Sequence, residues 1–398
     1  MNRDSLQDLI EQLDSWVQQN SDVAAVTVRQ PLQPVGGDGT EIFPPTYPAP
    51  TWWNENKHGR WLGYNIDVLT DGTRICLIDS VPSQAHRMSA LFKDSPYSDL
   101  VPQILITVQD SDGRDLTTVN LLDAGHRAAD LIVRRSRIGG MVEEAFRSLN
   151  KGDAVPMAKL SPLSLLFGVW DSRNTGVKTP RVLRSIIRGR VANTLSRSTI
   201  YRPPVNYENL GLLDFADTVP EKTLSGEGLT NAMEIMTHGG VICSEIWRAS
   251  SLSLVALRAL SAEPPDGSIS LRRYILGLAL VCLTAPHQPR LREGCELVPI
   301  PERAAETHLV RHDGTREPLQ LPKHEQAKEY ARWAADQFGV GENLTTLITQ
   351  DDLRKAVEER KQKQEEKRRK GQRGNRSRTA PADSDNTSAQ PETQEDGE

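Results

Sequence analysis

The chain has 398 residues and carries 48 Lys and Arg against 53 Asp and Glu, a formal net charge of −5. This length predicts one enlarged domain or two lobes followed by a tail, with enough residues for a sizeable core. The charge is segregated, because residues 126–201 hold fourteen Lys and Arg against five Asp and Glu, whereas the last sixteen residues hold six acids and neither Lys nor Arg. The acidic total therefore does not exclude a polyanionic partner for the basic region.

The cysteines and the apolar segments argue against secretion and membrane insertion. The four cysteines, Cys76, Cys243, Cys282 and Cys295, form no CxxC pair. The N-terminus resembles an amphipathic acidic helix without the apolar region of a signal peptide, so we expect a cytoplasmic protein. The most apolar run, 274–285, is shorter than the roughly twenty residues that cross a bilayer and predicts a buried helix.

The first two thirds of the predicted elements alternate between helix and strand, which favours an α+β or α/β fold. After the N-terminal helix, β-branched and apolar runs predict strands, and amphipathic runs predict helices. The predicted strands are 23–32, 73–81, 103–109 and 160–170, and the predicted helices are 83–92, 124–136 and 140–150. Two Pro-rich or Gly-rich stretches, about 35–62 and 197–240, are predicted insertions.

The last third is predicted to be mainly helical. Helices are expected within 229–236, 245–261, 271–284 and 323–339, the last ended by Gly339, and a hairpin at 307–321 with Asp313 and Gly314 at its turn. We expect the folded domain to span 1–345, followed by a charged helix at 346–370 and a disordered tail at 371–398. Residues 351–378 hold twelve cations and six acids, which suits either a solvated helix or nonspecific nucleic-acid affinity.

The stretch from 178 to 188 is predicted to be a helix with a cationic face. At 100° per residue Lys178, Arg181, Arg184 and Arg188 fall within one sector, and Val182, Leu183, Ile186 and Ile187 fall on the opposite side. A solvated surface usually mixes charge signs to gain i,i+4 pairs, and this sector contains no acid. A row of cations suits a polyanion backbone, although a merely solvated face stays open as an alternative.

The turn "DSRNTG" at 171–176 is expected to join a strand to that helix. Ser172, Asn174, Thr175 and Gly176 could then offer hydroxyls and amides to a phosphate near a helix N-terminus. No GK[ST] follows, so the turn is not a Walker loop. A simple turn capped by Asp171 or Thr175 explains the pattern equally well.

Two histidine patterns leave enzymatic and metal-binding alternatives open. His126 with Asp123 or Asp171 could perform acid–base chemistry, although no nucleophile motif accompanies it. His308 and His312 have HxxxH spacing but lie in the expected hairpin without a neighbouring Cys or a pair of carboxylates. We therefore predict no metal, no cofactor and no catalytic activity.

Three stretches in this order carry a family resemblance: "LIDSVPSQAHRM" at 77–88, "LLDAGHRAAD" at 121–130, and "LSPLSLLFGVWDSRNTGVKTPRVLRSIIRG" at 160–189. Together they resemble the backbone subunit of the type I-G (formerly I-U) CRISPR Cascade, a member of the RAMP superfamily, over roughly residues 20–340. The resemblance implies an α+β fold built on a modified RRM-like, ferredoxin-like palm. Finger and thumb elements would be inserted into that palm, at 43–61 and 197–240.

The resemblance also implies a function and partners. Copies of the subunit would stack head to tail along a guide RNA (crRNA), hold its phosphates and present its bases to a target DNA strand, beside other Cascade subunits. The alternative within the superfamily is an RNase that processes guide RNA. The RNA-binding candidates carried over are Ser83, Gln84, His86, Arg87, His126, Arg127, Ser172, Arg173, Lys178, Arg181, Arg184 and Arg188.

Overall fold

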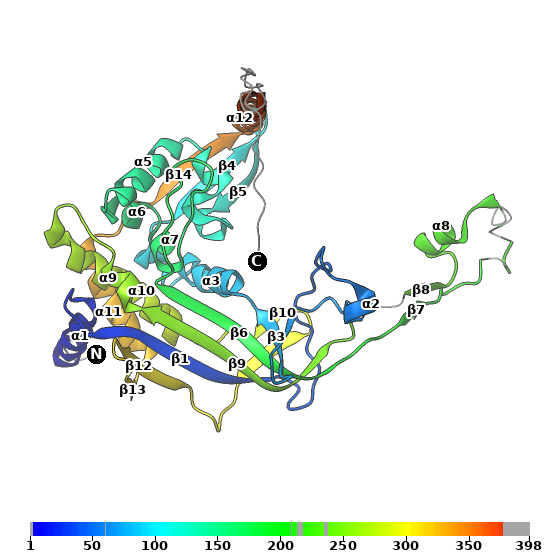
Figure 1. The fold of residues 1–398 in the computed structure, drawn as a ribbon, viewed down its shortest axis with the longest axis horizontal. Coiled ribbons are helices and arrows are strands. Elements are labelled where there is room, and N and C mark those ends of the chain that lie inside the picture. The colour runs from blue at the N-terminus through cyan, green and yellow to red at the C-terminus, as the bar shows by residue number, and fades with distance from the viewer. Residues whose placement is uncertain are drawn as a thin grey trace, which may run out of the picture.

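The fold is a mixture of α-helices and a curled antiparallel sheet, which confirms the α+β class (Figure 1). The computed structural model describes residues 3–59, 61–207, 209–211, 213, 218–234 and 238–376. The strand order does not by itself establish an RRM-like palm, so that finer detail stays a prediction.

The elements of the described residues have the following bounds. The α-helices are α1 (Arg3–Val17), α2 (Glu55–His58), α3 (Val81–Ala90), α4 (Leu131–Arg134), α5 (Gly139–Asn150), α6 (Val155–Leu160), α7 (Pro162–Phe167), α8 (Glu221–Gly226), α9 (Leu254–Arg258), α10 (Ser268–Thr284), α11 (His324–Phe338) and α12 (Gln350–Arg376). The strands are β1 (Val23–Pro34), β2 (Ile66–Val68), β3 (Arg74–Asp79), β4 (Ile104–Gln109), β5 (Asp115–Asn120), β6 (Leu183–Thr194), β7 (Thr199–Tyr201), β8 (Ala232–Glu234), β9 (Val241–Ser253), β10 (Arg290–Arg292), β11 (Cys295–Pro299), β12 (Glu306–Arg311), β13 (Arg316–Pro318) and β14 (Leu344–Thr349). Short 3₁₀ turns are η1 (Leu91–Lys93), η2 (Ser98–Leu100), η3 (Leu121–Asp123), η4 (Arg127–Ala129) and η6 (Pro265–Gly267).

The main sheet runs in the order β10-β11-β1-β9-β6-β3-β2, and β12 and β13 extend it beside the first half of β1. Its three long strands, β1, β9 and β6, lie side by side and curve across the molecule (Figure 1). Alternate residues of β6 are buried and exposed, as expected for a strand with one face on the core and one face outward.

Helices pack behind the inner face of this sheet. Helix α10 is almost wholly buried and packs against α11, where Gly277 leaves room for the backbone of Ala331. The segment Pro265–Thr284 is long and apolar enough to cross a membrane, yet 72% of its most apolar window is buried inside the protein. This burial confirms the buried helix expected over 274–285.

A second layer sits at one end of the sheet. Strand β14 pairs in parallel with β4, which pairs antiparallel with β5, and helices α4 to α7 lie beside them (Figure 1). Helix α12 follows β14 directly and begins where Asp352 accepts hydrogen bonds from Thr349. The charged helix expected at 346–370 runs from Gln350 to Arg376, because residues 346–349 belong to strand β14. Residues 377–398 of the expected tail lie outside the described residues.

Both predicted insertions leave the main sheet. The segment between β6 and β9 forms an arm of β7, β8 and α8 that projects far from the body (Figure 1). The segment between β1 and β2 contains little regular structure, and edge contacts between Trp53 and Trp61, with ring centroids 4.9 Å apart, help to order it. The assignment of either segment as thumb or finger stays a prediction.

Several predicted elements are wrong, and the most important is the cationic helix at 178–188. Residues from Leu183 onward form strand β6, paired with β3 and β9, and the residues before it form a loop. The positions four apart, 184 and 188, share a face in a strand as well as in a helix, so spacing alone could not separate the two. The β-branched residues Ile186 and Ile187 favour the strand.

Other corrections follow the same physical reasons. The predicted strand 160–170 is mostly helix α7 and follows the end of α6, because Pro162 is well suited to the first turn of a helix. The predicted helix 245–261 is mostly strand β9, and 229–236 contains strand β8. The predicted helix 124–136 is reduced to two short turns, η4 and α4. The strands at 23–32, 73–81 and 103–109, the helices at 83–92, 140–150 and 323–339, and the 307–321 hairpin are confirmed.

Candidate nucleic-acid interface

The outer face of the main sheet carries a row of arginines. Arg184, Arg188 and Arg190 are exposed and project from alternate positions of β6, and consecutive members of such a row are about 7 Å or 13 Å apart. No ion pair joins Arg184 or Arg188 to an acidic residue in the part of the chain that the structure describes. Their charge is therefore available to an external anion.

Neighbouring strands extend this cationic surface. Arg29 on β1 stacks over the Trp247 ring on β9, 4.4 Å from its centroid, and pairs with Glu245 at 2.8 Å. The same carboxylate lies 3.8 Å from Arg190. The result is a groove of about 350 Å³ across the three strands β1, β9 and β6 and the β12–β13 hairpin, lined among others by Thr27, Arg29, Arg184, Ile186, Arg188, Ser251, Glu306, His308 and Arg316. We call this surface the sheet groove.

The inner face of the same strand is joined to helix α3 by a buried polar network. Asp79, at the end of β3 and 4% exposed, accepts hydrogen bonds from Ser83 at 2.7 Å and from the amide of Gln84 at 2.6 Å. Arg87 donates to the same carboxylate at 3.1 Å and to the carbonyl of Leu291 at 2.6 Å. We call these groups the Asp79 network.

Strand β6 takes part in the Asp79 network through Ser185. The Ser185 hydroxyl donates to the Gln84 side-chain oxygen at 3.0 Å and accepts from Ser250 of β9 at 2.9 Å. Gln84 is buried, so its amide serves the interior of the protein. The structure thus places three of the predicted RNA-binding residues, Ser83, Gln84 and Arg87, around one carboxylate.

A second group of the predicted RNA-binding residues lies around Arg127. The Arg127 guanidinium lies 5.1 Å from the centroid of the Phe167 ring. Its Nε and Nη2 atoms are buried and have no hydrogen-bond partner among the described residues. Burial, with a smaller contribution from the nearby charge of Arg181, lowers the pKa of Arg127 to about 10. Burying a guanidinium without hydrogen-bond partners raises the free energy of the folded state. An anion that reached Arg127 would lower it again.

His86 belongs to the same group. Burial lowers the pKa of His86, the charge of Arg127 lowers it further, and a hydrogen bond to the backbone of Gly125 opposes both. His126 is exposed, and its backbone N–H donates to Asp130 at 3.0 Å. His86, from the first motif, therefore lies near His126 and Arg127, from the second motif.

The loop 168–182 holds the remaining candidates and is fixed by Asp171. This aspartate is 2% exposed, and one carboxylate oxygen accepts from the backbone and hydroxyl of Thr175, both at 2.9 Å. The loop is a hairpin in which Trp170 bridges to Lys178, so no helix N-terminus follows "DSRNTG" and the helix start expected there is wrong, while phosphate contact by these residues stays a prediction. Ser172, Arg173, Lys178 and Arg181 are all exposed on this loop.

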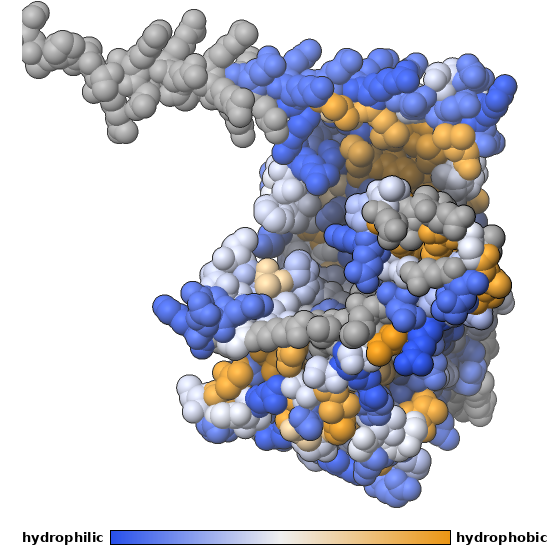
Figure 2. Space-filling model, turned by 90° about the vertical axis from the view of Figure 1, so that its right-hand side faces the viewer, coloured by the Kyte–Doolittle hydropathy of each residue, from blue (hydrophilic) through white to orange (hydrophobic). Residues whose placement is uncertain are grey.

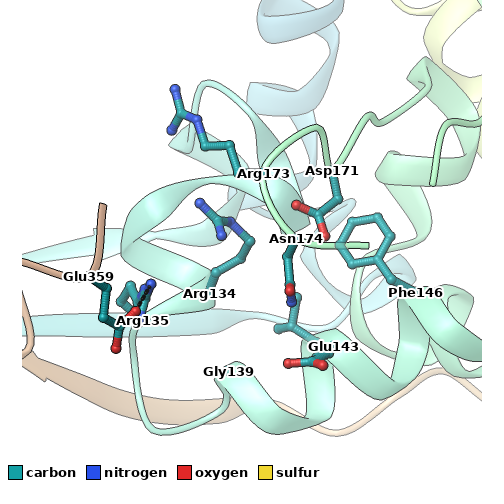
Figure 3. A pocket seen from close by; sticks show the side chains of 10 residues that line it. Arg134, Arg135, Gly139, Glu143, Phe146, Asp171, Arg173, Asn174 and Glu359 are labelled. Atoms are coloured by element: carbon teal, nitrogen blue, oxygen red, sulfur yellow. Dashed lines mark hydrogen bonds and ion pairs between the residues drawn. The ribbon is translucent and has the colours of Figure 1, made fainter. Parts of the chain in front are cut away.

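A small pocket lies behind the tip of this loop (Figure 3). Arg134 and Arg173 point to the same side of it, and Asn174 points toward Glu143, whose pKa is lowered chiefly by Arg147. Burial lowers the pKa of Arg134, and the charge of Asp171 opposes that shift. Acids therefore balance part of the positive charge here, as Glu245 does for Arg29 and Arg190 beside the sheet groove.

Helix α12 borders a further groove of about 590 Å³ beside α4. Its apolar lining is aliphatic, from Leu131, Leu353, Ala356 and Val357. Figure 2 shows hydrophobic residues gathered in a hollow beneath this helix, whose outer side is hydrophilic. Arg135 pairs with Glu359 of α12 at 2.6 Å across one side of the groove.

The alternative enzymatic and metal sites receive no support from the geometry. Asp123 pairs with Lys93 at 2.9 Å, and Asp171 is held within its own loop, so neither carboxylate forms a hydrogen bond with the His126 ring in the described residues. His308 lies in the sheet groove, whereas the His312 ring lies 3.3 Å from Arg258. Across the described ranges, no cluster of three His, Cys, Asp or Glu side chains could hold a metal ion.

Comparison with known families gives a match for the part of the chain that contains β6 and the loop before it. Residues 26–194 match the family described as CRISPR-associated protein GSU0053. The match runs from β1 to the end of β6 and contains all three motifs of the sequence resemblance. The CRISPR-associated resemblance is thereby confirmed, and the match supports a role in CRISPR defence. A search of curated proteins found no match.

Sequence reasoning missed several residues of this cationic surface. Arg190 follows Arg188 by two positions, and a period of two in "LRSIIRGR" is the signal that would have included it. Arg29 and Trp247 join the groove only through strand pairing, for which the sequence offers no local signal. Trp170 stands within the quoted "FGVWDSR" motif but was not selected.

Proposed function

We propose that the protein is a non-enzymatic guide-RNA-binding scaffold of a CRISPR Cascade-type complex, and that the sheet groove holds the RNA phosphates. The observation that carries this proposal is the row of exposed arginines on β6, two of which have no acidic partner in the described residues. Each cation that meets a phosphate displaces counterions, so such a row binds RNA without regard to sequence.

The Asp79 network has a supporting role in this proposal. Gln84 and Ser185 tie helix α3 to the back of β6, so they fix the strand that presents the arginines. Ser83 and Arg87 complete the hydrogen bonds of Asp79. Ser83, Gln84 and Arg87 therefore act as positioning residues. The direct contacts to RNA are made by Arg127, Arg181, Arg184 and Arg188. Base pairing with a target DNA strand would then supply the sequence specificity.

Assembly along the guide is part of the same proposal. Several copies would bind one RNA head to tail, in contact with other subunits of the complex, through an open heterologous interface. The projecting arm of β7, β8 and α8 extends beyond the body, so it can contact a neighbouring copy (Figure 1). The family match supports the CRISPR setting.

Native mass spectrometry of the full chain with guide-like RNAs of increasing length tests the assembly. We expect the number of bound proteins to rise in steps with RNA length and the complexes to fall apart after RNase treatment. One protein per RNA at every length, or no bound RNA, would overturn the scaffold. RNA cleavage that stops in His126→Ala with retained binding would favour the RNase alternative.

A double substitution tests the sheet groove. We expect Arg184→Glu with Arg188→Glu to weaken single-stranded RNA binding and to flatten the slope of log K against log salt by about 1.4 or more, since two phosphate contacts are lost. The matched control is Arg114→Glu with Arg303→Glu, two exposed arginines outside the groove. Equal losses in both variants, or no loss in the first, would contradict the assignment of this groove.

A further inference from the structure

The hairpin loop 168–182 presents an indole to solvent. Trp170 is 59% exposed, whereas its neighbours Val169 and Asp171 are 6% and 2% exposed. Large aromatic side chains usually bury 150–250 Å² in folding, so an indole left outward on a loop contributes little to the core. Packing in the core therefore does not account for the outward position of this indole.

The backbone beneath this indole is held in place. Thr179 and Val169 exchange hydrogen bonds at 2.9 Å on one side, and the backbone N–H of Asp171 donates to Val177 at 2.9 Å on the other. Gly168 has φ 77°, and a Cβ there would lie 3.0 Å from Arg181 and 3.1 Å from the carbonyl of Thr179. The indole is therefore presented from a fixed position, at low entropic cost for a ligand.

The exposed charged residues of the loop itself are all cationic. Lys178 lies over the ring, 5.4 Å from its centroid, and Arg173 and Arg181 are exposed on the same loop. The one acid of the loop, Asp171, is buried and bonded within it. An indole has two faces and Lys178 covers at most one, so the ring can still receive a planar group.

We propose that Trp170 is a base-stacking site for single-stranded RNA, on the loop that leads into the arginine-bearing strand β6. An exposed aromatic ring among cations is the chemistry by which single strands are held, because every base has a π-face and every nucleotide has a phosphate. Arg181 links this site to β6, since the loop ends where the strand begins. The inference rests on the proposed RNA-binding function and adds an aromatic contact to a base beside the charge contacts of the arginine row.

The test compares two RNAs of equal length, one normal and one abasic, by fluorescence anisotropy with the full-length protein. We expect Trp170→Ala to weaken binding of the normal RNA by about 5- to 150-fold and to leave binding of the abasic RNA unchanged. The salt dependence should stay the same, because no phosphate contact is lost. Trp170→Phe, which keeps a ring, should retain most of the affinity for normal RNA.

Every other outcome contradicts the stacking site, and each one points to a different cause. Equal affinity of wild type and Trp170→Ala for the normal RNA removes the base contact. Equal losses for both RNAs mean that the indole acts on the loop or on phosphates. RNA affinity that persists while stepwise assembly is lost identifies a protein contact instead. Wild-type protein that binds neither RNA overturns the proposed function as well, whereas the first three outcomes leave it standing.

Discussion

The two faces of β6 carry opposite chemistry on alternating residues of one short stretch. Outward, Arg184 and Arg188 stand exposed without an acidic partner among the described residues. Inward, Ser185 lies in a chain of buried hydrogen bonds that ends at Asp79, and Ile187 is fully buried. One face therefore satisfies its polar groups within the protein, and the other leaves its charge for a ligand.

This difference teaches how to divide a motif into roles. Residues of "SQAHR" and "RVLRSIIRG" were grouped as RNA contacts because they share a family resemblance. Burial and hydrogen bonding separate those that hold the strand from those that present charge. Substitutions on the inner face should therefore act first on stability, and substitutions on the outer face should act first on RNA affinity.

The largest expected effect on stability is at Asp79, the carboxylate at the centre of the Asp79 network. Asp79→Asn should lower the free energy of unfolding by about 3 kcal/mol, because it leaves the partly buried Arg87 without its counter-charge. Glu245→Gln on the outer face is the matched control, and should cost less than about 1 kcal/mol because its pair with Arg29 is partly solvated. Denaturant unfolding of both variants measures the difference, and equal costs would break the comparison.

The pH dependence of stability gives a second test of the inner face, through the buried side chain of His287. Burial lowers the pKa of His287 to about 4, and the positive charges of Arg248 and Arg87 add to this effect, while Asp79 and a hydrogen bond to Leu297 oppose it. The unfolded chain binds a proton near pH 6.5, whereas the folded chain binds it only near pH 4, so stability falls as the pH falls between these values.

His287→Asn removes this titration and keeps an amide that can donate to Leu297. Between pH 7 and pH 4 we expect the wild type to lose about 1–2 kcal/mol more stability than the variant, allowing for solvent screening of a half-buried ring. Urea unfolding at several pH values measures this loss. Parallel pH profiles of the two proteins would show that His287 is not held neutral by the fold.

The sequence predicted much of the fold but divided the site incorrectly. The strand at 73–81 and the helix at 323–339 were predicted because each has a clear local period and, in the helix, a terminal Gly339. For β6 the spacing of Arg184 and Arg188 fits the period of a helix and that of a strand. Only the pairing with β3 and β9 shows that the segment is a strand. Tertiary pairing overrides such ambiguous patterns.

The inner network lay beyond sequence reasoning for a different reason. Gln84 and Ser185 are 101 residues apart, so nothing local indicates their hydrogen bond. The exposure of Trp170 is equally invisible, because a tryptophan after an apolar run is usually expected in the core. By contrast, the cationic nature of the region was visible in composition alone, and that part of the site was predicted.

The smallest expected effect on stability is on the outer face, at Arg184 and Arg188. Arg184→Gln with Arg188→Gln should change the free energy of unfolding by no more than about 0.5 kcal/mol, because both side chains are exposed and lose no ion pair within the described residues. Thermal and urea unfolding against the wild type measure this. A loss above about 1 kcal/mol would mean that the arginines stabilise the sheet, and weaker RNA binding in any outer-face variant would then reflect unfolding. Near-equal stability lets the loss of RNA affinity be assigned to the contacts themselves.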